Sequence, residues 1–272
     1  MYTSIDDDDR RGHLLNRDLQ KIGHWAEQWK VTFNHTKTEL LNITRHTAAP
    51  TNQLFFQDTL LTANVTHKHL GLILEPNCKW DSQIKNILSK CLTLTSCLRS
   101  FKYRLNRKTL EIMYKSFILP VLDYGDIIWD NCTEILSNKL EEVQLDALRT
   151  ISGSVRGTSH AKLYQETGFI PLKERRKRHK LLLFFKFVNN MLPAHINRKF
   201  PELVSDTNPY HRRRPNDRTI PFSRTTLYQK SYFPSATTCW NELPEHVQTY
   251  TSIGRFKKYL TRLDHIVPTY FL

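Results

Sequence analysis

The sequence predicts an α+β fold that is mainly α-helical. Residues 1–76 combine one helical pattern with about five short strand patterns, whereas residues 77–272 contain almost only helical patterns. The chain has 272 residues, of which 39% are hydrophobic and 24% are charged. Such a composition can bury a core, and it excludes a chain that is disordered throughout.

The N-terminal part is expected to be one helix followed by small antiparallel sheets. Residues 13–29 place leucines, Ile22 and two tryptophans at helical spacing, so one face of this helix can be buried. Two of the later strand patterns flank Gln57 and Asp58, which predicts a hairpin. Pro76 ends the last strand. The predicted strands are 31–33, 40–43, 54–56, 60–61 and 69–74.

The rest of the chain is read as a series of helices. Asp81 begins the first, Pro120 breaks or kinks the second, and Thr133 and Gly153 mark the two ends of a long one. Pro171 is a favoured first helical residue and opens the next long helix. The expected helices are 81–98, 107–119, 121–129, 133–152, 159–167, 171–192, 236–240 and 253–263.

The sequence shows no clear targeting signal and no cysteine pattern typical of disulfides or metal sites. The N-terminus has neither a basic region nor an apolar one, and no apolar run approaches the length of a membrane span. We therefore expect an intracellular protein without a membrane partner, in the nucleus or the cytoplasm.

The five cysteines are odd in number and widely spaced, which favours buried free thiols. His67 and His69 are too few ligands for a metal site, so none is predicted.

Positive charge is concentrated in one stretch of the chain. The formal net charge is +14, but residues 1–170 carry 21 basic and 19 acidic residues. Residues 171–230 carry 15 basic and only 4 acidic residues. A face for an anionic partner is therefore expected in this second stretch.

Two basic clusters lie in the stretch 171–230, one on a helix and one in a polar loop. The helical cluster begins just after Pro171, where cations oppose the helix dipole unless an anion docks there. Two interpretations remain open, a solvated charged face and a contact with nucleic acid. The helix cations are Lys173, Arg175, Arg176, Lys177, Arg178 and Lys180, and the loop adds Arg212, Arg213 and Arg214.

Several short motifs follow one another in a fixed order along the chain. They are 14–19, 25–34, 37–39, 67–71, 114–125, 128–130, 175–180, 231–236 and 240–241. This series resembles the C-terminal part of the reverse transcriptase of non-LTR (LINE-type, jockey-like) retrotransposons. The resemblance covers roughly residues 12–263, and the order of the motifs makes it specific.

The resemblance implies three regions. Residues 1–76 would be a palm remnant, residues 77–156 a helical thumb, and residues 157–272 a basic helical region with a loop near 204–230. His69 and Gly71 would lie in a primer-grip hairpin, where glycine permits close approach to a primer strand, or else at an ordinary buried strand end. Lys37 matches the lysine of an Asn-x-x-Lys-Thr motif near the nucleotide site, and a surface lysine is its simpler interpretation.

The family's catalytic aspartates are expected to be absent from this chain. In the family, a paired Asp-Asp on a palm hairpin helps to hold two Mg²⁺ ions, and it lies just upstream of the segment that corresponds to Met1. The run 6–9 is a poor replacement, because it lacks the preceding apolar strand and adjacent strand residues face opposite ways. We therefore expect no catalytic residue, metal site or cofactor here, although the intact family enzyme would use Mg²⁺.

The function expected from the sequence is that of a truncated reverse-transcriptase-like protein of a mobile element. It would not be an enzyme by itself, and it would bind the backbone of RNA or DNA without regard to sequence. One alternative is a helical scaffold that binds protein or self-associates through an exposed palm edge near Trp25 and Trp29. Another is a polymerase fragment that is active only when a palm is supplied in trans.

Overall fold

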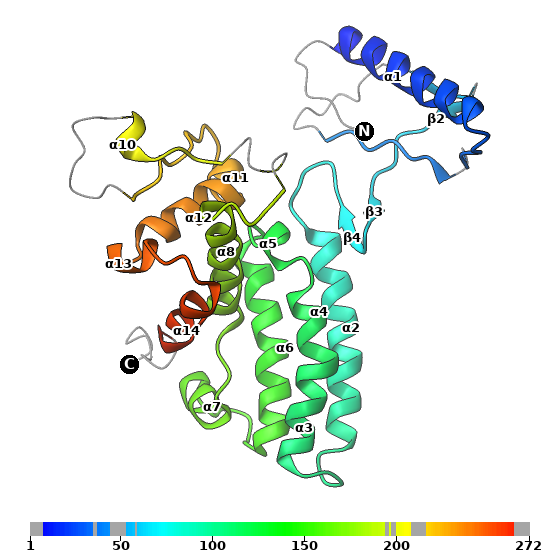
Figure 1. Cartoon of the computed structure of the whole chain (residues 1–272). Helices are drawn as coiled ribbons and strands as arrows, with labels where there is room; N and C mark the ends of the chain where they lie inside the picture. The colour runs from blue at the N-terminus through cyan, green and yellow to red at the C-terminus, as the bar shows by residue number, and fades with distance from the viewer. Residues whose placement is uncertain are drawn as a thin grey trace. The chain divides into compact units, whose positions relative to one another are not determined.

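The computed structural model confirms an α+β chain that is mainly helical (Figure 1). The chain divides into two compact units, Met1–Gln83 and Ile84–Leu272. Nothing in this division tests the three predicted regions, which stay a prediction. The described residues are 8–34, 37–43, 53–57, 59–193, 196, 200–207 and 216–263.

The first unit begins with helix α1 (Asp8–Gln28), close to the predicted helix. The chain leaves α1 through a hydrogen-bonded closure in which Val31 N donates to Ala26 O at 2.9 Å and Lys30 N to Glu27 O at 3.3 Å. Lys30 takes a positive φ of 53° to make this Schellman-type turn. The strand predicted at 31–33 is therefore wrong, since Val31 serves to close the helix.

The predicted hairpin is confirmed as β1 (Leu54–Phe56) and β2 (Thr59–Leu61), which pair antiparallel. Leu54, Phe56 and Leu61 are buried, and leucines and Ile22 of α1 pack on them. The strand predicted at 40–43 is wrong within the described residues, because only an isolated parallel bridge from Leu40 to Ala63 forms there.

The strand predicted at 69–74 is a hairpin rather than one strand. β3 (His67–His69) pairs antiparallel with β4 (Leu72–Leu74), and two residues make the turn. Leu70 and Gly71 have φ values of 46° and 84°, the two successive positive φ angles that a tight hairpin of this twist requires. Gly71 supplies one of them without strain. The apolar Leu70 hid the turn from the strand pattern, whereas the family resemblance implies a hairpin here.

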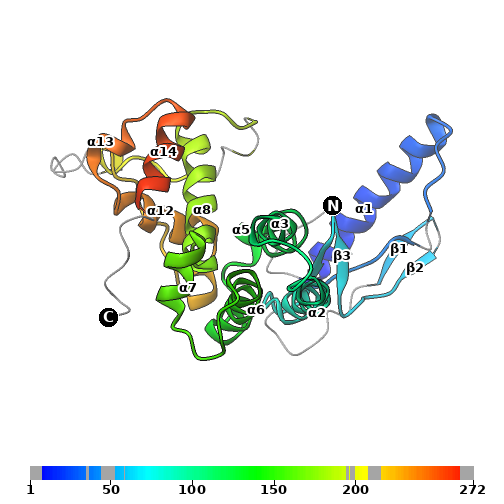
Figure 2. The ribbon, with the colours of Figure 1, turned by 90° about the horizontal axis from the view of Figure 1, so that it is seen from below.

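The second unit contains helices that run alongside one another (Figures 1 and 2). α2 (Asp81–Ser100) is followed by α3 (Arg107–Met113), a π-helical turn (Tyr114–Ile118), α4 (Leu119–Asp123) and α5 (Asp126–Trp129). The expected break at Pro120 takes the form of the π turn just before it, where Leu119 N donates to Tyr114 O. Gly125 separates α4 from α5.

The capping signals in the middle of the chain are confirmed. Thr133 accepts a hydrogen bond from Leu136 N at the start of α6 (Glu134–Ser152), and Gly153 ends that helix with a φ of 75°. Ser159 caps α7 (His160–Thr167) in the same way as Thr133 caps α6.

Pro171 precedes α8 (Leu172–Val188), which ends earlier than the predicted residue 192. Asn190 takes a φ of 51°, and Met191 N donates to Lys186 O at 2.9 Å, so a second Schellman-type closure terminates the helix. Asparagine is, after glycine, a favoured residue for this conformation.

The last helices pack their aromatic side chains against α8. They include α12 (Tyr232–Asn241) and α14 (Ile253–Leu263), the latter with the predicted bounds. Phe185 stacks on Phe256 with ring centroids 4.5 Å apart, and Phe184 lies 5.2 Å from Trp240. α8 thus lies at the centre of this core. Only the side of α8 that faces away from these aromatic rings is left for other contacts. The described residues of this unit also contain the four-residue helices α10 (Val204–Thr207), α11 (Thr226–Gln229) and α13 (Glu245–Gln248).

The loop predicted near 204–230 is only partly described, and Arg212, Arg213 and Arg214 lie outside the described residues. All five cysteines are free, as predicted, but only Cys91 and Cys132 are buried, whereas Cys78 and Cys239 are half-buried and Cys97 is exposed. None of the helices in the described ranges is both long and apolar enough to cross a membrane.

Candidate nucleic-acid interface

The predicted basic helix is α8, and its charged side faces three aspartates. Asp123 ends α4, Asp126 begins α5, and Asp130 directly follows α5. We call Asp123, Asp126 and Asp130 the aspartate row. Asp123 and Asp130 form ion pairs with side chains of α8, and Asp126 makes a hydrogen bond with His179.

Asp123 forms a bidentate pair with Arg175. The guanidinium Nε lies 2.7 Å from Oδ1, and Nη2 lies 2.7 Å from Oδ2. Both side chains are less than one-third exposed. Burial works against the charge of Arg175, but hydrogen bonding and attraction to Asp123 outweigh it and raise the pKa of the guanidinium. Arg175 is therefore held as an internal cation.

Asp130 binds two cations at once. Arg176 Nε lies 2.7 Å from Oδ1, and Lys180 Nζ lies 2.6 Å from Oδ2. Both residues are buried, at 4% and 7% exposure, and each also donates to a serine, Arg176 to Ser137 and Lys180 to Ser235. Burial opposes ionisation of Asp130, but Lys180 and Arg176 together outweigh it and lower its pKa. One carboxylate thus pairs with two buried cations, so this trio keeps one net positive charge inside the fold.

Asp126 pairs with His179 and raises the question of a metal site. His179 Nδ1 lies 2.5 Å from Asp126 Oδ2, and Asp126 is 3% exposed. Asp123, Asp126 and His179 bring their ligand atoms within 4.8 Å of one another. The carboxylate of Asp123, however, already accepts hydrogen bonds from Arg175 through both oxygens. A metal ion would have to displace that guanidinium, so we interpret the cluster as an ion-pair network.

The structure therefore divides the six predicted helix cations. Arg175, Arg176 and Lys180 pair with the aspartate row, and Lys177 pairs with Glu242 at 3.1 Å. The interpretation of a solvated face is wrong for the buried Arg176 and Lys180. Lys173 is exposed, and Arg178 is half-buried with a partner of its own. Nucleic-acid binding by these residues is untested and stays a prediction.

The other predicted site residues lie in the first unit. Lys37 is exposed, next to a turn in which its N–H donates to Asn34 O at 3.1 Å. His69 is exposed at the end of β3, with its ring stacked 5.9 Å from that of His67. Gly71 forms the neighbouring hairpin turn, so the structure places His69 and Gly71 together.

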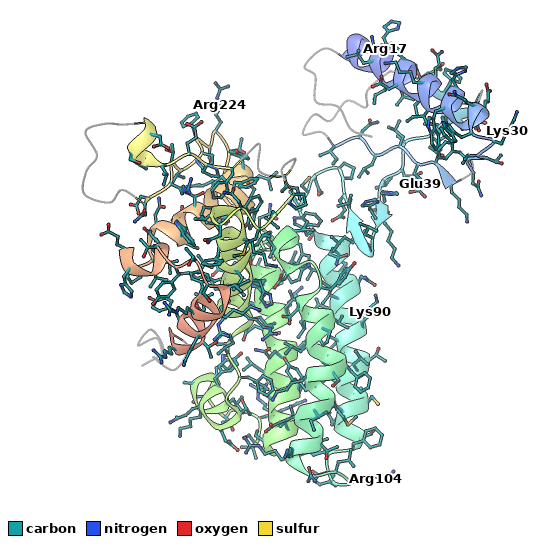
Figure 3. All side chains as sticks on the ribbon, viewed as in Figure 1. Arg17, Lys30, Glu39, Lys90, Arg104 and Arg224 are labelled. Carbon is teal, nitrogen blue, oxygen red and sulfur yellow. The ribbon has the colours of Figure 1, made fainter. Side chains whose placement is uncertain are left out.

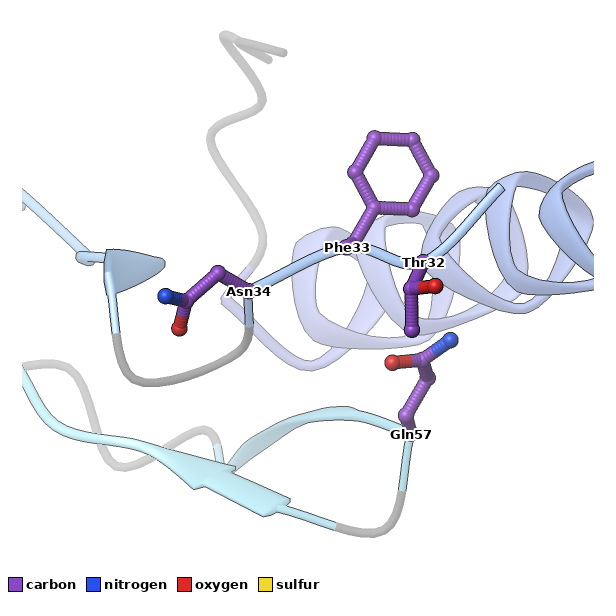
Figure 4. Close-up of a pocket in the computed structure, with 4 residues that line it drawn as sticks. All are labelled: Thr32, Phe33, Asn34 and Gln57. Carbon is purple, nitrogen blue, oxygen red and sulfur yellow. The ribbon is translucent and has the colours of Figure 1, made fainter.

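An open pocket also lies in the first unit, where Thr32, Phe33, Asn34 and Gln57 line it (Figure 4). These side chains supply one hydroxyl group, two amides and an aromatic ring. They include no group that titrates near neutral pH, so they offer no acid–base chemistry.

Sequence analysis missed a second basic surface, at the turn between α2 and α3. We call Lys102, Tyr103, Arg104 and Lys108 the tip surface. Figure 3 shows Arg104 at this end of the helices. Tyr103 is 92% exposed, Arg104 and Lys108 are exposed, and Lys102 is half-exposed. In the part of the chain that the structure describes, none of these three cations forms an ion pair with a carboxylate.

A signal for the tip surface does exist in the sequence. Residues 82–110 contain seven basic residues and no acidic one. The count of charged residues over 1–170 concealed this basic run, because acidic residues elsewhere in that window balance its charge. A shorter window would have predicted two basic surfaces instead of one.

Comparison with known proteins finds two curated relatives from Drosophila melanogaster. A probable RNA-directed DNA polymerase from transposon BS is 24% identical over 172 residues, which is 61% of this chain and 19% of that protein. The RNA-directed DNA polymerase from mobile element jockey is 25% identical over 143 residues, which is 52% of this chain and 16% of that protein. The chain thus spans less than a fifth of the length of the curated relatives it matches.

No protein-family model and no solved structure matches the chain. The two relatives nevertheless confirm the resemblance drawn from the ordered motifs. The chain is similar to part of the reverse transcriptase of jockey-like, non-LTR mobile elements.

Proposed function

We propose that this chain binds the backbone of RNA or DNA, without regard to sequence, as a segment of a reverse-transcriptase-like protein of a mobile element. The observation that carries the proposal is the similarity to two RNA-directed DNA polymerases over half of the chain or more. The net charge of +14 supports it, because a large positive charge favours binding to phosphates.

Two of the residues predicted from the sequence suit this role best. Lys37 and Lys173 are exposed, and neither forms an ion pair in the described part of the chain. We propose both as phosphate contacts. Arg176 and Lys180 would have to leave Asp130 to reach a phosphate, which would leave a buried carboxylate unpaired. Arg212, Arg213 and Arg214 stay a prediction.

A salt titration tests the proposal. Binding of the full chain to labelled duplex and single-stranded oligonucleotides of unrelated sequences is measured by fluorescence anisotropy. We expect similar affinities for unrelated sequences, with log affinity falling against log salt by about 0.9 per contacted phosphate on duplex and about 0.7 on a single strand. Absence of salt-dependent binding at low ionic strength would overturn the proposal.

We further propose that this chain by itself does not polymerise DNA. Its sequence contains no Phe/Tyr-Ala-Asp-Asp motif. The candidate metal cluster in the described part of the chain, Asp123, Asp126 and His179, has Arg175 bound to it. Primer extension with template, nucleotides and Mg²⁺ is expected to give no product. Extension by the chain alone would contradict this, and extension only with an added palm would support activity in trans.

Self-association is an alternative function that one observation favours. Trp25 on α1 and Trp29, the residue directly after α1, are 49% and 65% exposed, with ring centroids 6.4 Å apart. Exposed aromatic pairs are typical of protein interfaces. Light scattering of the chain and of Trp29→Glu tests this. A concentration-dependent dimer that the variant abolishes would support it, and a monomer at all concentrations would exclude it.

A further inference from the structure

The tip surface presents a bare aromatic ring among cations that lack carboxylate partners. Tyr103 is 92% exposed, the largest exposed fraction among the large hydrophobic side chains in the described ranges. Lys102 Nζ lies 5.6 Å from its ring centroid. The ring therefore contributes little apolar burial to the fold, and it stays accessible to a partner.

The backbone that carries Tyr103 is ordered by several hydrogen bonds. Arg104 N and Leu105 N both donate to Phe101 O, at 2.9 and 3.0 Å. Asn106 Oδ1 then caps α3 by accepting from Thr109 N at 2.9 Å. Because the turn is fixed before any partner arrives, binding here loses less conformational entropy than binding by a flexible loop.

Nearby carboxylates are already engaged elsewhere. Arg107 follows the turn and holds Glu111 at 3.2 Å and Glu166 at 3.1 Å. Both carboxylates therefore pair with Arg107, and in the described residues neither pairs with a cation of the tip surface. Lys102, Arg104 and Lys108 are left to present positive charge to solvent.

We infer that the tip surface binds single-stranded nucleic acid, with an unpaired base stacked on Tyr103 and with Lys102, Arg104 and Lys108 contacting the flanking phosphates. The inference rests on the proposed function and deepens it by naming the form of the nucleic acid. Aromatic rings amid cations are the usual means of binding single strands, because every unpaired base has a face that can stack. In a duplex those faces are covered by neighbouring base pairs.

The central experiment compares Tyr103→Ala and Tyr103→Phe in the full chain. Binding to labelled oligo(U) and oligo(dT) of 20 nucleotides is measured beside a 20-base-pair duplex. We expect Tyr103→Ala to weaken single-strand binding by about 5- to 150-fold, the range for losing one base–aromatic stack. Tyr103→Phe should stay within about twofold of the unchanged chain. Duplex binding should change little in either variant.

Matched controls separate a local contact from a general change. Tyr228→Ala removes another tyrosine, 46% exposed on α11, and should leave single-strand binding unchanged. Lys102→Gln, Arg104→Gln and Lys108→Gln together should weaken binding more than the triple change Lys257→Gln, Lys258→Gln and Arg262→Gln. The latter removes the same charge from exposed positions of α14.

The outcomes distinguish this inference from the proposed function. If the unchanged chain binds no oligonucleotide, both are overturned. If it binds but Tyr103→Ala has no effect, or weakens duplex and single strand equally, only the inference fails. Vesicles of phosphatidylcholine and phosphatidylserine form the last arm. Loss of vesicle binding in Tyr103→Ala with unchanged oligonucleotide binding would overturn the inference in favour of a membrane surface.

Discussion

The two basic surfaces of this chain differ in what faces them. The cations of α8 lie opposite the aspartate row, and three of them pair with its carboxylates inside the fold. The cations of the tip surface meet no carboxylate in the described residues, and they surround an exposed tyrosine. The denser cluster in the sequence is thus the less available one. Charge density along a sequence does not predict availability, because the acidic partners lie about 50 residues away.

The largest expected effect comes from removing the shared carboxylate of α8. Asp130→Asn leaves Arg176 and Lys180 buried without a charged partner, and we expect it to lower the free energy of unfolding by about 3–5 kcal/mol. Urea denaturation measures this. The matched control is Asp146→Asn, whose pair with Arg99 is more than one-third exposed, with an expected cost of about 0–1 kcal/mol. Equal losses of unfolding free energy in Asp130→Asn and Asp146→Asn would contradict the stated difference between buried and exposed ion pairs.

The charge of Asp130 also predicts a pH dependence of stability. Its pKa is lowered in the folded state, so its contribution is complete above the unfolded value of about 3.9 and is lost as pH falls through the folded value. Below about pH 4 the unchanged chain should therefore lose stability more steeply than Asp130→Asn. Burial raises the pKa of Glu141, but that residue is present in both proteins and cancels in the comparison. Parallel curves of unfolding free energy against pH would argue against an ionised Asp130.

The tip surface should behave in the opposite way, with little effect on stability and a clear effect on binding. The triple change of Lys102, Arg104 and Lys108 to glutamine should alter the free energy of unfolding by less than about 0.5 kcal/mol. It should reduce the slope of log affinity against log salt by about 2 on a single strand. An unchanged slope would show that these cations do not contact phosphates.

Among the ion pairs of α8, the smallest effect on stability is expected on the outward side of this helix. Lys177 pairs with Glu242, but the two side chains are 42% and 57% exposed. Glu242→Gln should therefore cost about 1 kcal/mol or less in unfolding free energy. A cost comparable to that of Asp130→Asn would mean that burial does not set the strength of these pairs.

Local signals predicted much of the helical part. Thr133 and Gly153 mark the two ends of α6 because a hydroxyl cap and a left-handed glycine are local requirements. Lys30 and Asn190 also end helices, but they do so with a positive φ that glycine usually supplies. A lysine or an asparagine therefore marks the end of a helix less clearly than a glycine does. For this reason the sequence predicts a strand at 31–33 and places the end of α8 too late in the chain.

The candidate site could be predicted only in part. The sequence identified the six cations of the first half of α8, but it could not show that Asp123 and Asp130, from other segments, would pair with them. Such pairing depends on how distant segments pack. The tip surface carried a local signal, the absence of acidic residues from 82 to 110, which a coarse charge count concealed.

The most direct test of the account is the rate at which single lysines of the native chain react with an amine-labelling reagent, followed by mass spectrometry. Lys180 is 7% exposed and bound to Asp130, whereas Lys108 is exposed on the tip surface. We expect Lys108 to react much faster than Lys180 in the folded chain and at a similar rate in urea. Equal rates in the folded chain would contradict the claim that the basic helix keeps its charge inside the fold.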